Sequence, residues 1–510
     1  KKLYTEDYHA PLYFFILHFW MKFFGSSDNV LRLLSAIIGI LTIPAIYFLG
    51  KTISNRTLGM ISAVLLSISS LHIYYSQEVR FYILLVLFSI LSSLFCLLIL
   101  DKPSIKNLSG LVLSNLAILF TFTTGFIYIL IQQSVIGLYL FKKKSNSFKK
   151  YVISGMLAWL IFLPYVSVIR HQIKSMSDSF IDPYAWIDFN ISSIFSIIQN
   201  WFSPVLTNIY NNSSSYFFNI YDFEYIVYIL IPVLICLFGL FKAIQSQNDK
   251  ILVLFIINFL FIFFEIIFAC LDKTGFLTRY TLIVYPIILL ISAYGLLQIK
   301  KNTIKTMIFL IFLIVNLSYV LIGDKSVLKI QRIGKYKHIS KELMKFNFNK
   351  HDILFMPYGG KFFYKYYNNT RVLDLDFWNI FMVNKKEILL NIIDTQTVKQ
   401  LTRENSKILL KNFLSTKNPT KKFENYFNKA IFDKLPKGRY FIIVSPGNDP
   451  GFNPKIQLYS KKENEFYRQN AHLIIGSKII NNFIECSNKK LHMAYYKNIG
   501  FSKILVFKKQ

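Results

Sequence analysis

Charged residues are scarce in this chain, and acidic residues are the scarcest of them. Only 17% of the 510 residues are Asp, Glu, Lys or Arg, whereas 54% are hydrophobic. A soluble domain usually carries about a quarter charged residues. The mean hydropathy of +0.41 points the same way. The composition therefore excludes a wholly soluble protein and indicates an integral membrane protein.

Cysteine is also scarce, and its placement is uninformative about redox environment. Three of the four cysteines lie within or at the ends of apolar runs, and no C-x-x-C spacing occurs. This distribution argues against a disulfide framework and against a zinc site. The four are Cys96, Cys236, Cys270 and Cys486.

The shortage of acid leaves 58 basic against 27 acidic residues and a formal net charge of +31. Such a charge can serve nucleic-acid binding, but here the lysines are spread over loops and the tail, not along one amphipathic element. Lysines on the cytoplasmic side of membrane spans account for much of the excess, and a basic outer surface suits anionic lipid or polysaccharide. We expect membrane lipids as partners and no nucleic acid.

The sequence also lacks an initiating methionine and a recognisable signal peptide. It starts at Lys1, and its polar residues 1–9 run straight into an apolar helix. We expect further sequence upstream, including at least one more span.

Long apolar runs occupy the chain as far as Ile322, and about twenty apolar residues cross a bilayer. The stretch Pro11–Phe24 is shorter, aromatic and amphipathic, which predicts a helix lying in the membrane interface. Ten spans are predicted after it, at about 31–50, 57–75, 81–100, 108–123, 125–141, 151–169, 225–241, 251–270, 280–297 and 306–322.

Alternate loops between these spans are rich in lysine and arginine, and by the positive-inside rule they face the cytoplasm. The other loops and everything after residue 323 then face outward. The long outward loop 170–224 is either a lid over a cavity or a passive linker with interfacial tryptophans. The basic loops carry Lys51 and Arg56; Lys102 and Lys106; Lys142, Lys143, Lys144, Lys149 and Lys150; Lys242 and Lys250; and Lys300, Lys301 and Lys305.

From residue 324 the sequence changes to globular character. Short β-type runs at 351–357, 437–447 and 503–509 are bounded by Gly, Pro and Asn. Residues 385–413 have a helical apolar period, and GNDPG at 447–451 predicts a turn. We therefore predict a transmembrane domain over residues 1–323 and an outward-facing α/β domain over 324–510. No hydrolase triad, P-loop or metal-cluster spacing occurs in the second.

A short polar segment, Leu71–Tyr82 (LHIYYSQEVRFY), interrupts two long apolar runs. It carries Glu78 and Arg80 at the edge of a predicted span. Ionisable residues are costly at that depth and mark a functional site by default. We take this segment as the centre of the candidate site.

Three segments occur in a recognisable order: HAPLYFFILHFWMKFFG (9–25), LRLLSAIIGILTIPAIYFLG (31–50) and SISSLHIYYSQEVRFY (67–82). They resemble the opening of bacterial glycosyltransferases related to protein O-mannosyltransferases and lipid A aminoarabinose transferases, with the patterns H-P-P-L-Y-Y, A-L-R-L-P-S and Y-S-Q-E-A-R-x-Y. A looser match, FLTRYTLIVYP (276–286), is similar to the family's R-Y-x-x-x-x-x-P. The resemblance implies a polytopic α-helical membrane protein of the GT-C type that transfers sugar from a polyprenyl phosphate with inversion.

The sequence departs from the family pattern at several positions. Ala10 replaces the first proline of H-P-P, and Leu34 stands where the family usually has proline, although Ser35 is kept. The family's Asp-Glu pair of the first outward loop, which supplies its catalytic base, is not in the sequence. We expect that pair upstream of Lys1; use of Glu6 or Asp7 in its place is the alternative.

The resemblance implies roles for the residues that match the motifs. Glu78 is expected to bind sugar hydroxyls, orient Arg80 or hold a divalent ion; whether a metal takes part stays open. The alternative is a carboxylate that complements a helix dipole. Arg80 and Arg279 are expected to bind the phosphate, because guanidinium is permanently charged and bidentate. Their alternative is anchoring at the lipid headgroups.

The remaining candidates are a proton acceptor, a hydrogen-bond donor and polar residues that meet the sugar. Solvation or packing is the alternative for each of them, and Tyr13 is assigned to the aromatic belt at the interface. They are Asp7 as a base, His9 as a donor to phosphate or acceptor, and Tyr75, Gln77 and Tyr280 as substrate contacts.

These patterns predict a glycosyltransferase on the outer face of a bacterial inner membrane, with a polyprenyl-phosphate-sugar donor and a lipid, glycan or protein acceptor. A transporter or flippase of lipid-linked sugars is one rival; it predicts broken spans in matching halves and charges at mid-membrane, for which Glu265 is the one candidate. A non-catalytic scaffold that binds polysaccharide is the other. An acidic pair upstream of Lys1 would favour catalysis over the scaffold.

Overall fold

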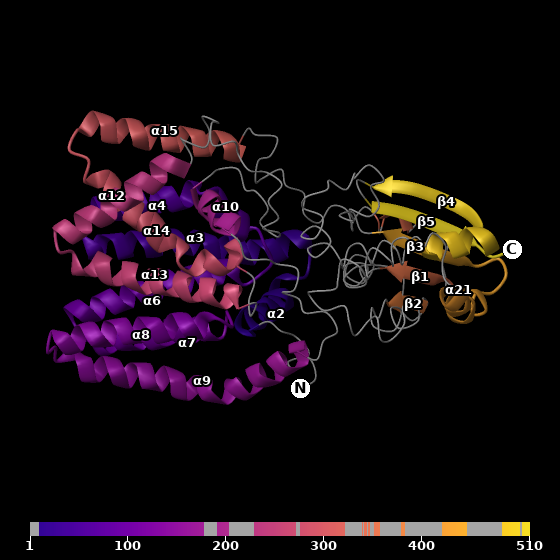
Figure 1. Cartoon of the computed structure of the whole chain (residues 1–510), viewed down its shortest axis with the longest axis horizontal. Coiled ribbons are helices and arrows are strands. Elements are labelled where there is room, and N and C mark those ends of the chain that lie inside the picture. Colours follow the sequence, from indigo (N-terminus) through magenta and orange to yellow (C-terminus); the bar gives the residue numbers. More distant parts are fainter. Residues whose placement is uncertain are drawn as a thin grey trace. The chain divides into compact units, whose positions relative to one another are not determined.

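The computed structural model of the chain describes residues 10–177, 191–202, 229–271, 276–321, 339, 341–343, 345–346, 351–356, 379–382, 421–445, 482–499 and 502–510. Contacts divide the chain into two compact units, residues 1–330 and 331–510. The first is a bundle of helices, and the second is built on a mixed β-sheet (Figure 1). The predicted polytopic helical membrane protein with a C-terminal α/β domain is confirmed.

Within the described residues, five helices are long and apolar enough to cross a membrane on their own. Their exposed faces are covered with large apolar side chains, such as Met156 and Leu160 on α9, which would be a liability in water but suit contact with lipid. These helices are α3 (Asp28–Ile53), α6 (Tyr82–Asp101), α8 (Gly125–Lys142), α9 (Ser147–Ser177) and α13 (Asp249–Cys270).

Shorter helices complete the bundle. The helix α2 lies where an interfacial helix was predicted, and α10 lies in the predicted outward loop 170–224. The 3-10 helix η2 covers the predicted start of the span 280–297. The remaining elements are α2 (Leu12–Phe24), α4 (Arg56–Ile68), α5 (Ser70–Ser76), α7 (Ile105–Leu119), α10 (Ile191–Phe202), α12 (Ile231–Gln245), η2 (Thr278–Ile283), α14 (Tyr285–Leu297) and α15 (Asn302–Leu321).

The predicted span 57–75 is not one straight helix. It consists of α4 and α5, which are bent by 64° at their junction. Ser69 leaves helical geometry there, and its side chain accepts a hydrogen bond from the backbone N–H of His72. Serine favours such a cap over a helix interior because its hydroxyl competes for backbone groups. The bend turns the polar segment away from the axis of α4.

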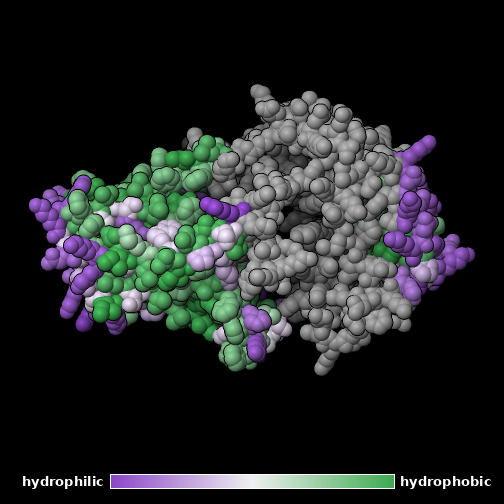
Figure 2. Space-filling model, turned by 90° about the horizontal axis from the view of Figure 1, so that it is seen from below, coloured by the Kyte–Doolittle hydropathy of each residue, from purple (hydrophilic) through white to green (hydrophobic). Residues whose placement is uncertain are grey.

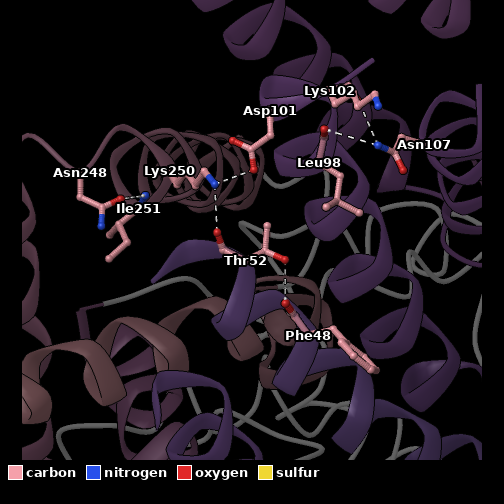
Figure 3. Close-up of polar contacts among 9 residues, drawn as sticks. All are labelled: Phe48, Thr52, Leu98, Asp101, Lys102, Asn107, Asn248, Lys250 and Ile251. Carbon is pink, nitrogen blue, oxygen red and sulfur yellow. Dashed lines mark hydrogen bonds and ion pairs between the residues drawn. The ribbon is translucent and has the colours of Figure 1, made fainter. Parts of the chain in front are cut away.

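Four of the five basic loops meet at one end of the bundle. The Lys250 ammonium donates to Asp101 Oδ2 at 2.7 Å and to the Thr52 carbonyl at 2.9 Å (Figure 3). Lys143 forms an ion pair with Asp249 at 3.1 Å. These contacts join the loops that follow α3, α6 and α8 to the loop that precedes α13. Hydrophilic residues gather at one end of the bundle, and hydrophobic residues cover its sides (Figure 2).

The second unit contains a five-stranded sheet in the order β2-β1-β3-β5-β4. β1 pairs in parallel with β2 and β3, whereas β5 is antiparallel to β3 and β4. Phe483, on the helical stretch 482–490, packs against Phe423 and Phe441. The elements are β1 (Ile353–Met356), β2 (Asn379–Met382), α21 (Lys421–Phe427), the π-helical turn η4 (Asn428–Phe432), β3 (Tyr440–Ser445), β4 (His492–Ile499) and β5 (Ser502–Lys508).

Three of these strands occupy the runs predicted from the sequence, namely β1, β3 and β5. The other two were missed because β2 has only four residues and β4 (HMAYYKNI) contains lysine and asparagine among its apolar residues. The predicted helix at 385–413 and turn at 447–451 lie outside the described residues.

Candidate functional site

The polar segment forms the short helix α5 and the turn that follows it, and neighbouring helices hold α5 on two sides. The Ser69 hydroxyl is hydrogen-bonded to the Tyr285 hydroxyl of α14. On the other side, His72 Nε2 lies 2.7 Å from Thr42 Oγ1 of α3. A side chain at Gly39 would collide with Ser76, so glycine permits the close approach of α3 and α5. The start of the turn is therefore fixed by packing.

Side chains of α3 bind the backbone of the turn itself. Arg32 Nη1 donates to the Gln77 carbonyl at 2.8 Å, and Ser35 Oγ donates to the Glu78 carbonyl at 2.7 Å. Arg32 and Ser35 are three residues apart and so share one face of α3. They satisfy carbonyls that the end of a helix leaves without an intrahelical partner. The sequence analysis did not assign them to the site, although both belong to the L-R-L-x-S motif.

Tyr13 of α2 completes this arrangement. Its hydroxyl lies 2.8 Å from Ser35 Oγ, and because the single serine proton goes to the Glu78 carbonyl, the tyrosine must be the donor. Tyr13 is fully buried. The prediction that it belongs to an aromatic belt at the interface is therefore wrong: its hydroxyl finds a protein partner inside the bundle, so water or headgroups are not needed.

The charged groups of the turn lie together with those of η2, about 200 residues later in the chain. Glu78 is buried and Arg80 is exposed. Both lie within electrostatic range of the Tyr82 hydroxyl, as do Arg279 and Tyr280. The ring of Tyr75 packs edge-on against Tyr82 at 5.0 Å between centroids. The Tyr75 hydroxyl also lies within electrostatic range of Arg279.

Arg279 is positioned by aromatic contacts and has donor capacity to spare. Its guanidinium lies over the Tyr280 ring at 5.1 Å, and Nη2 makes a long hydrogen bond of 3.4 Å to the same hydroxyl. Its buried Nε has no hydrogen-bond partner among the described residues. A buried donor of this kind favours an anionic ligand.

The helix α10 fixes η2 from the side. Asn200 Nδ2 donates to Thr278 Oγ1 at 2.9 Å, and Trp201 Nε1 donates to Thr281 Oγ1 at 3.2 Å. These two bonds flank Arg279 and Tyr280. Within the predicted loop 170–224, the helix α10 thus supports the candidate site, and the lid and the passive linker both stay predictions.

Six of the eight predicted site residues therefore lie in one region: Tyr75, Gln77, Glu78, Arg80, Arg279 and Tyr280. Gln77 contributes its carbonyl to the Arg32 bond, and the catalytic roles of all six stay predictions. Asp7 and His9, with the alternative base Glu6, lie outside the described residues. The described residues contain no group of three or more His, Cys, Asp or Glu side chains suited to a metal ion.

Glu265, the candidate for a mid-membrane charge, is displaced from the middle of its helix. It is five residues from Cys270, the end of α13, which corresponds to about 7.5 Å along the helix. Its neighbour is Thr124 at the start of α8. The structure thus places this carboxyl near the end of the bundle that carries the candidate site.

Comparison with known proteins shows which sequences and folds the chain is similar to. Residues 8–168 match the family model described as dolichyl-phosphate-mannose-protein mannosyltransferase. None of the curated proteins matches the sequence. The chain is similar to the structure of ArnT from Cupriavidus metallidurans bound to undecaprenyl phosphate, with a TM-score of 0.53 and 9% identity over 98% of this chain and 88% of that one.

The apo state of the same ArnT gives a TM-score of 0.53 and 9% identity over 98% of this chain and 87% of that one. The apo oligosaccharyltransferase of Archaeoglobus fulgidus gives 0.49 and 9% over 98% of this chain and 81% of that one. The predicted resemblance to GT-C glycosyltransferases and the GT-C fold are confirmed. The ArnT structures show the fold, and the match to the family model covers residues 8–168.

Proposed function

We propose that this GT-C membrane protein transfers a sugar from a polyprenyl-phosphate donor to an acceptor hydroxyl at the outer surface of a bacterial inner membrane. The observation that carries the proposal is the cluster of Glu78, Arg80 and Arg279 at the end of the bundle opposite the basic loops. The two ends are joined by α6, which runs from Tyr82 to Asp101. Its 20 residues span about 30 Å, the thickness of a bilayer's hydrocarbon core.

The two guanidinium groups suit the departing phosphate. In the transfer, the acceptor oxygen attacks the anomeric carbon, the bond from that carbon to the phosphate oxygen breaks, and the phosphate leaves with the electron pair. Arg80 and Arg279 would stabilise the charge that develops there, a contribution typically worth about 10²–10³ in rate per donor. Attack from the face opposite the phosphate inverts the anomeric centre.

A carboxylate is needed to take the proton of the acceptor hydroxyl, which contributes about 10²–10⁴ in rate. Glu78 and Asp7 are the candidates in this sequence. Glu78 is buried in the turn that also carries Arg80, and Ser35 donates a hydrogen bond to its carbonyl. That placement also suits a contact with sugar hydroxyls, so we assign Glu78 to the donor side of the reaction.

An apolar cavity next to the site suits the hydrocarbon tail of the donor. It is an open pocket of about 80 Å³ between α4, α10, α12, α14 and α15. Phe202 lines it and directly follows Trp201, which binds η2. The cavity therefore begins beside the segment that carries Arg279. Its wall includes Leu65, Phe202, Pro232, Leu289, Leu296 and Phe312.

The membrane orientation belongs to the same proposal. The positive-inside rule places the basic loops in the cytoplasm, so the candidate site and the α/β domain would be extracytoplasmic. Labelling of single-cysteine variants by an impermeant reagent in intact cells tests this, with one cysteine in the turn after α5 and one in the loop after α8.

The test of function is transfer by the purified full-length protein from a panel of polyprenyl-phosphate sugars. Arg80→Ala and Arg279→Ala should each lower kcat/KM by roughly a hundredfold, and Arg279→Lys should recover part of the loss because it keeps the charge but not the bidentate fork. Arg56→Ala, an exposed arginine at the basic end, is the matched control. Wild-type rates in both folded alanine variants would refute the site.

A further inference from the structure

At one end of the five-stranded sheet, β3 and β4 begin and β5 ends. Tyr440, the first residue of β3, pairs with Lys508, the last residue of β5, and Lys508 also pairs with His492, the first residue of β4. Neighbouring strands lie about 4.8 Å apart, so this row extends about 10 Å across the sheet. The loop that precedes β3 lies at the same end, because the Gly438 N–H donates to the Lys509 carbonyl at 2.7 Å.

Lysines gather at this end, and the groups that hold their ammonium groups are neutral. Lys509 Nζ donates to the carbonyls of Phe432 and Leu435 at 2.6 and 2.7 Å. Lys490 Nζ donates to Asn428 Oδ1 at 2.6 Å. Neutral partners leave the positive charges uncompensated, and a group of like charges attracts an anion. We call this group the basic sheet end; it consists of Lys434, Lys437, Lys490, Lys508 and Lys509.

Nearby carboxylates offset little of that charge. Asp352 is fully buried in an ion pair with an arginine side chain. Glu424 and Glu485 lie 3.2 and 4.0 Å from Lys489, a cation outside the basic sheet end. Asp433 is exposed in the loop before β3 and can balance one of the lysines. The basic sheet end therefore keeps most of its positive charge.

Two half-buried aromatic rings lie beside these cations. The ammonium groups of Lys490 and Lys509 lie 5.3 and 4.2 Å from the centroid of the Phe432 ring. The Lys508 ammonium lies 5.9 Å from the centroid of the Tyr440 ring. An aromatic face binds apolar C–H surface as well as cations. An aromatic ring next to an ammonium group therefore suits a sugar ring that carries an anionic substituent.

The exposed apolar side chains of β4 lie elsewhere on the sheet. Met493 pairs with Phe507 and Tyr496 with Leu505, and both β4 side chains are exposed. Because successive residues of a strand point to opposite faces, both lie on the face opposite to Lys508. A surface that binds a lipid bilayer usually combines basic and apolar side chains. Their separation here favours a hydrated polyanion over a lipid surface.

We propose that the basic sheet end binds an anionic glycan, a saccharide polymer with phosphate or carboxylate groups. The ammonium groups of Lys437, Lys490 and Lys508 meet its anions, and the rings of Phe432 and Tyr440 pack against its sugars. Binding there requires no residue of the candidate site in the first unit. The inference thus goes beyond the proposed function and can be tested without the transfer reaction.

The experiment measures the affinity of defined probes for the full-length protein in nanodiscs of phosphatidylcholine. The probes are oligogalacturonate and phosphorylated dextran, each compared with its uncharged counterpart, methyl-esterified oligogalacturonate and plain dextran. Binding is measured at about 50 mM salt, where surface charges are weakly screened, and again at about 500 mM. In the wild type, at least one anionic probe should bind about tenfold more tightly than its counterpart at low salt only.

The test variant is Lys437→Gln/Lys490→Gln/Lys508→Gln. A contact between exposed charges contributes modestly, and loss of three such contacts should lower the affinity for the anionic probe roughly tenfold. A second variant, Lys434→Gln/Lys437→Gln, alters only the loop before β3 and should lose about threefold. The thermal unfolding midpoint of each variant shows whether it is folded.

The matched control, Lys142→Gln/Lys144→Gln/Lys149→Gln, removes the same charge from three exposed lysines of the first unit. It should change the affinity by less than about twofold. Unchanged affinity in the folded test variants, equal losses in test and control, or no preference of the wild type for an anionic probe would overturn the inference. Equal or tighter binding of inorganic polyphosphate of the same charge would overturn the assignment of a glycan, as would binding of phosphatidylglycerol vesicles without glycan binding.

Discussion

Ser35→Ala tests the claim that α3 and α2 hold the backbone of Glu78. The substitution removes two buried hydrogen bonds, one from Ser35 to the Glu78 carbonyl at 2.7 Å and one from Tyr13 to Ser35 at 2.8 Å. The carbonyl keeps its bond from the Arg80 N–H at 2.8 Å, but the Tyr13 hydroxyl loses its only described partner. A buried group left unsatisfied costs about 1–3 kcal/mol. We expect a total loss of about 2–3 kcal/mol.

Part of that loss should appear in catalysis, because the carbonyl that loses the Ser35 bond belongs to Glu78, a candidate site residue. If about 1–2 kcal/mol of the lost stabilisation raises the barrier to transfer because Glu78 is displaced, kcat/KM falls by roughly 5–30-fold. Tyr13→Phe removes only the second bond and should cost about 1 kcal/mol. Since the bond it removes is already absent in Ser35→Ala, the double variant should be no worse than Ser35→Ala alone.

The assay is a double-mutant cycle on both the thermal unfolding midpoint in detergent and kcat/KM for transfer. Ser67→Ala is the matched control, because Ser67 is exposed on α4 and bonds only the Val64 carbonyl of its own helix. It should change neither quantity beyond about 0.5 kcal/mol. Additive effects of Ser35→Ala and Tyr13→Phe would contradict the proposed chain of bonds, and an unaltered Ser35→Ala protein would refute it.

Three further predictions concern the cavity and the second unit. Leu289→Trp, which fills the apolar cavity, should raise KM roughly tenfold for long-chain polyprenyl donors and leave short-chain donors unaffected; equal effects on both would argue against tail binding there. Arg439→Met should destabilise the second unit by about 3–5 kcal/mol, seen as faster hydrogen exchange in β1 and β3, because it strips the fully buried Asp352 of its ion pair; unchanged exchange would show that the pair is not needed. Hydrogen bonds from Lys345 and Lys497 lower the pKa of Glu342 to about 2, so its stabilising contribution is complete above about pH 4.5 and is lost as pH falls toward 2. Resistance to proteolysis should therefore fall less with acidification in Glu342→Gln than in the wild type. An equal fall in both proteins would show that this carboxyl does not cause it.

Much of the membrane architecture could be predicted from local sequence. Runs such as Tyr82–Asp101 are apolar throughout, and a helix is the form in which an isolated segment satisfies its backbone in lipid. The polar segment around Glu78 stood out for the same reason, since polar residues at a span's edge are costly. In the second unit, β3 and β5 were predictable because both are continuous β-branched and aromatic runs.

The break between α4 and α5 was less accessible. The hydropathy of 57–75 is continuous, and the end of α4 at Ser69 depends on a serine side chain that caps the next helix and binds Tyr285, more than 200 residues away. Strand β4 was missed for a related reason. It is held in the sheet by pairing with β5, and its own polar residues obscure the alternation of apolar and polar positions that would predict a strand.

The sequence by itself determined that the chain enters a membrane, where its helices lie, and that Glu78 and Arg80 are out of place among apolar residues, because hydropathy and residue type are local properties. Only the tertiary structure decided that Ser35 and Tyr13 hold their turn and that α10 fixes η2. Those relations follow from which helices pack together and at what register. That choice depends on side-chain contacts between segments far apart in the chain, which no window of sequence contains.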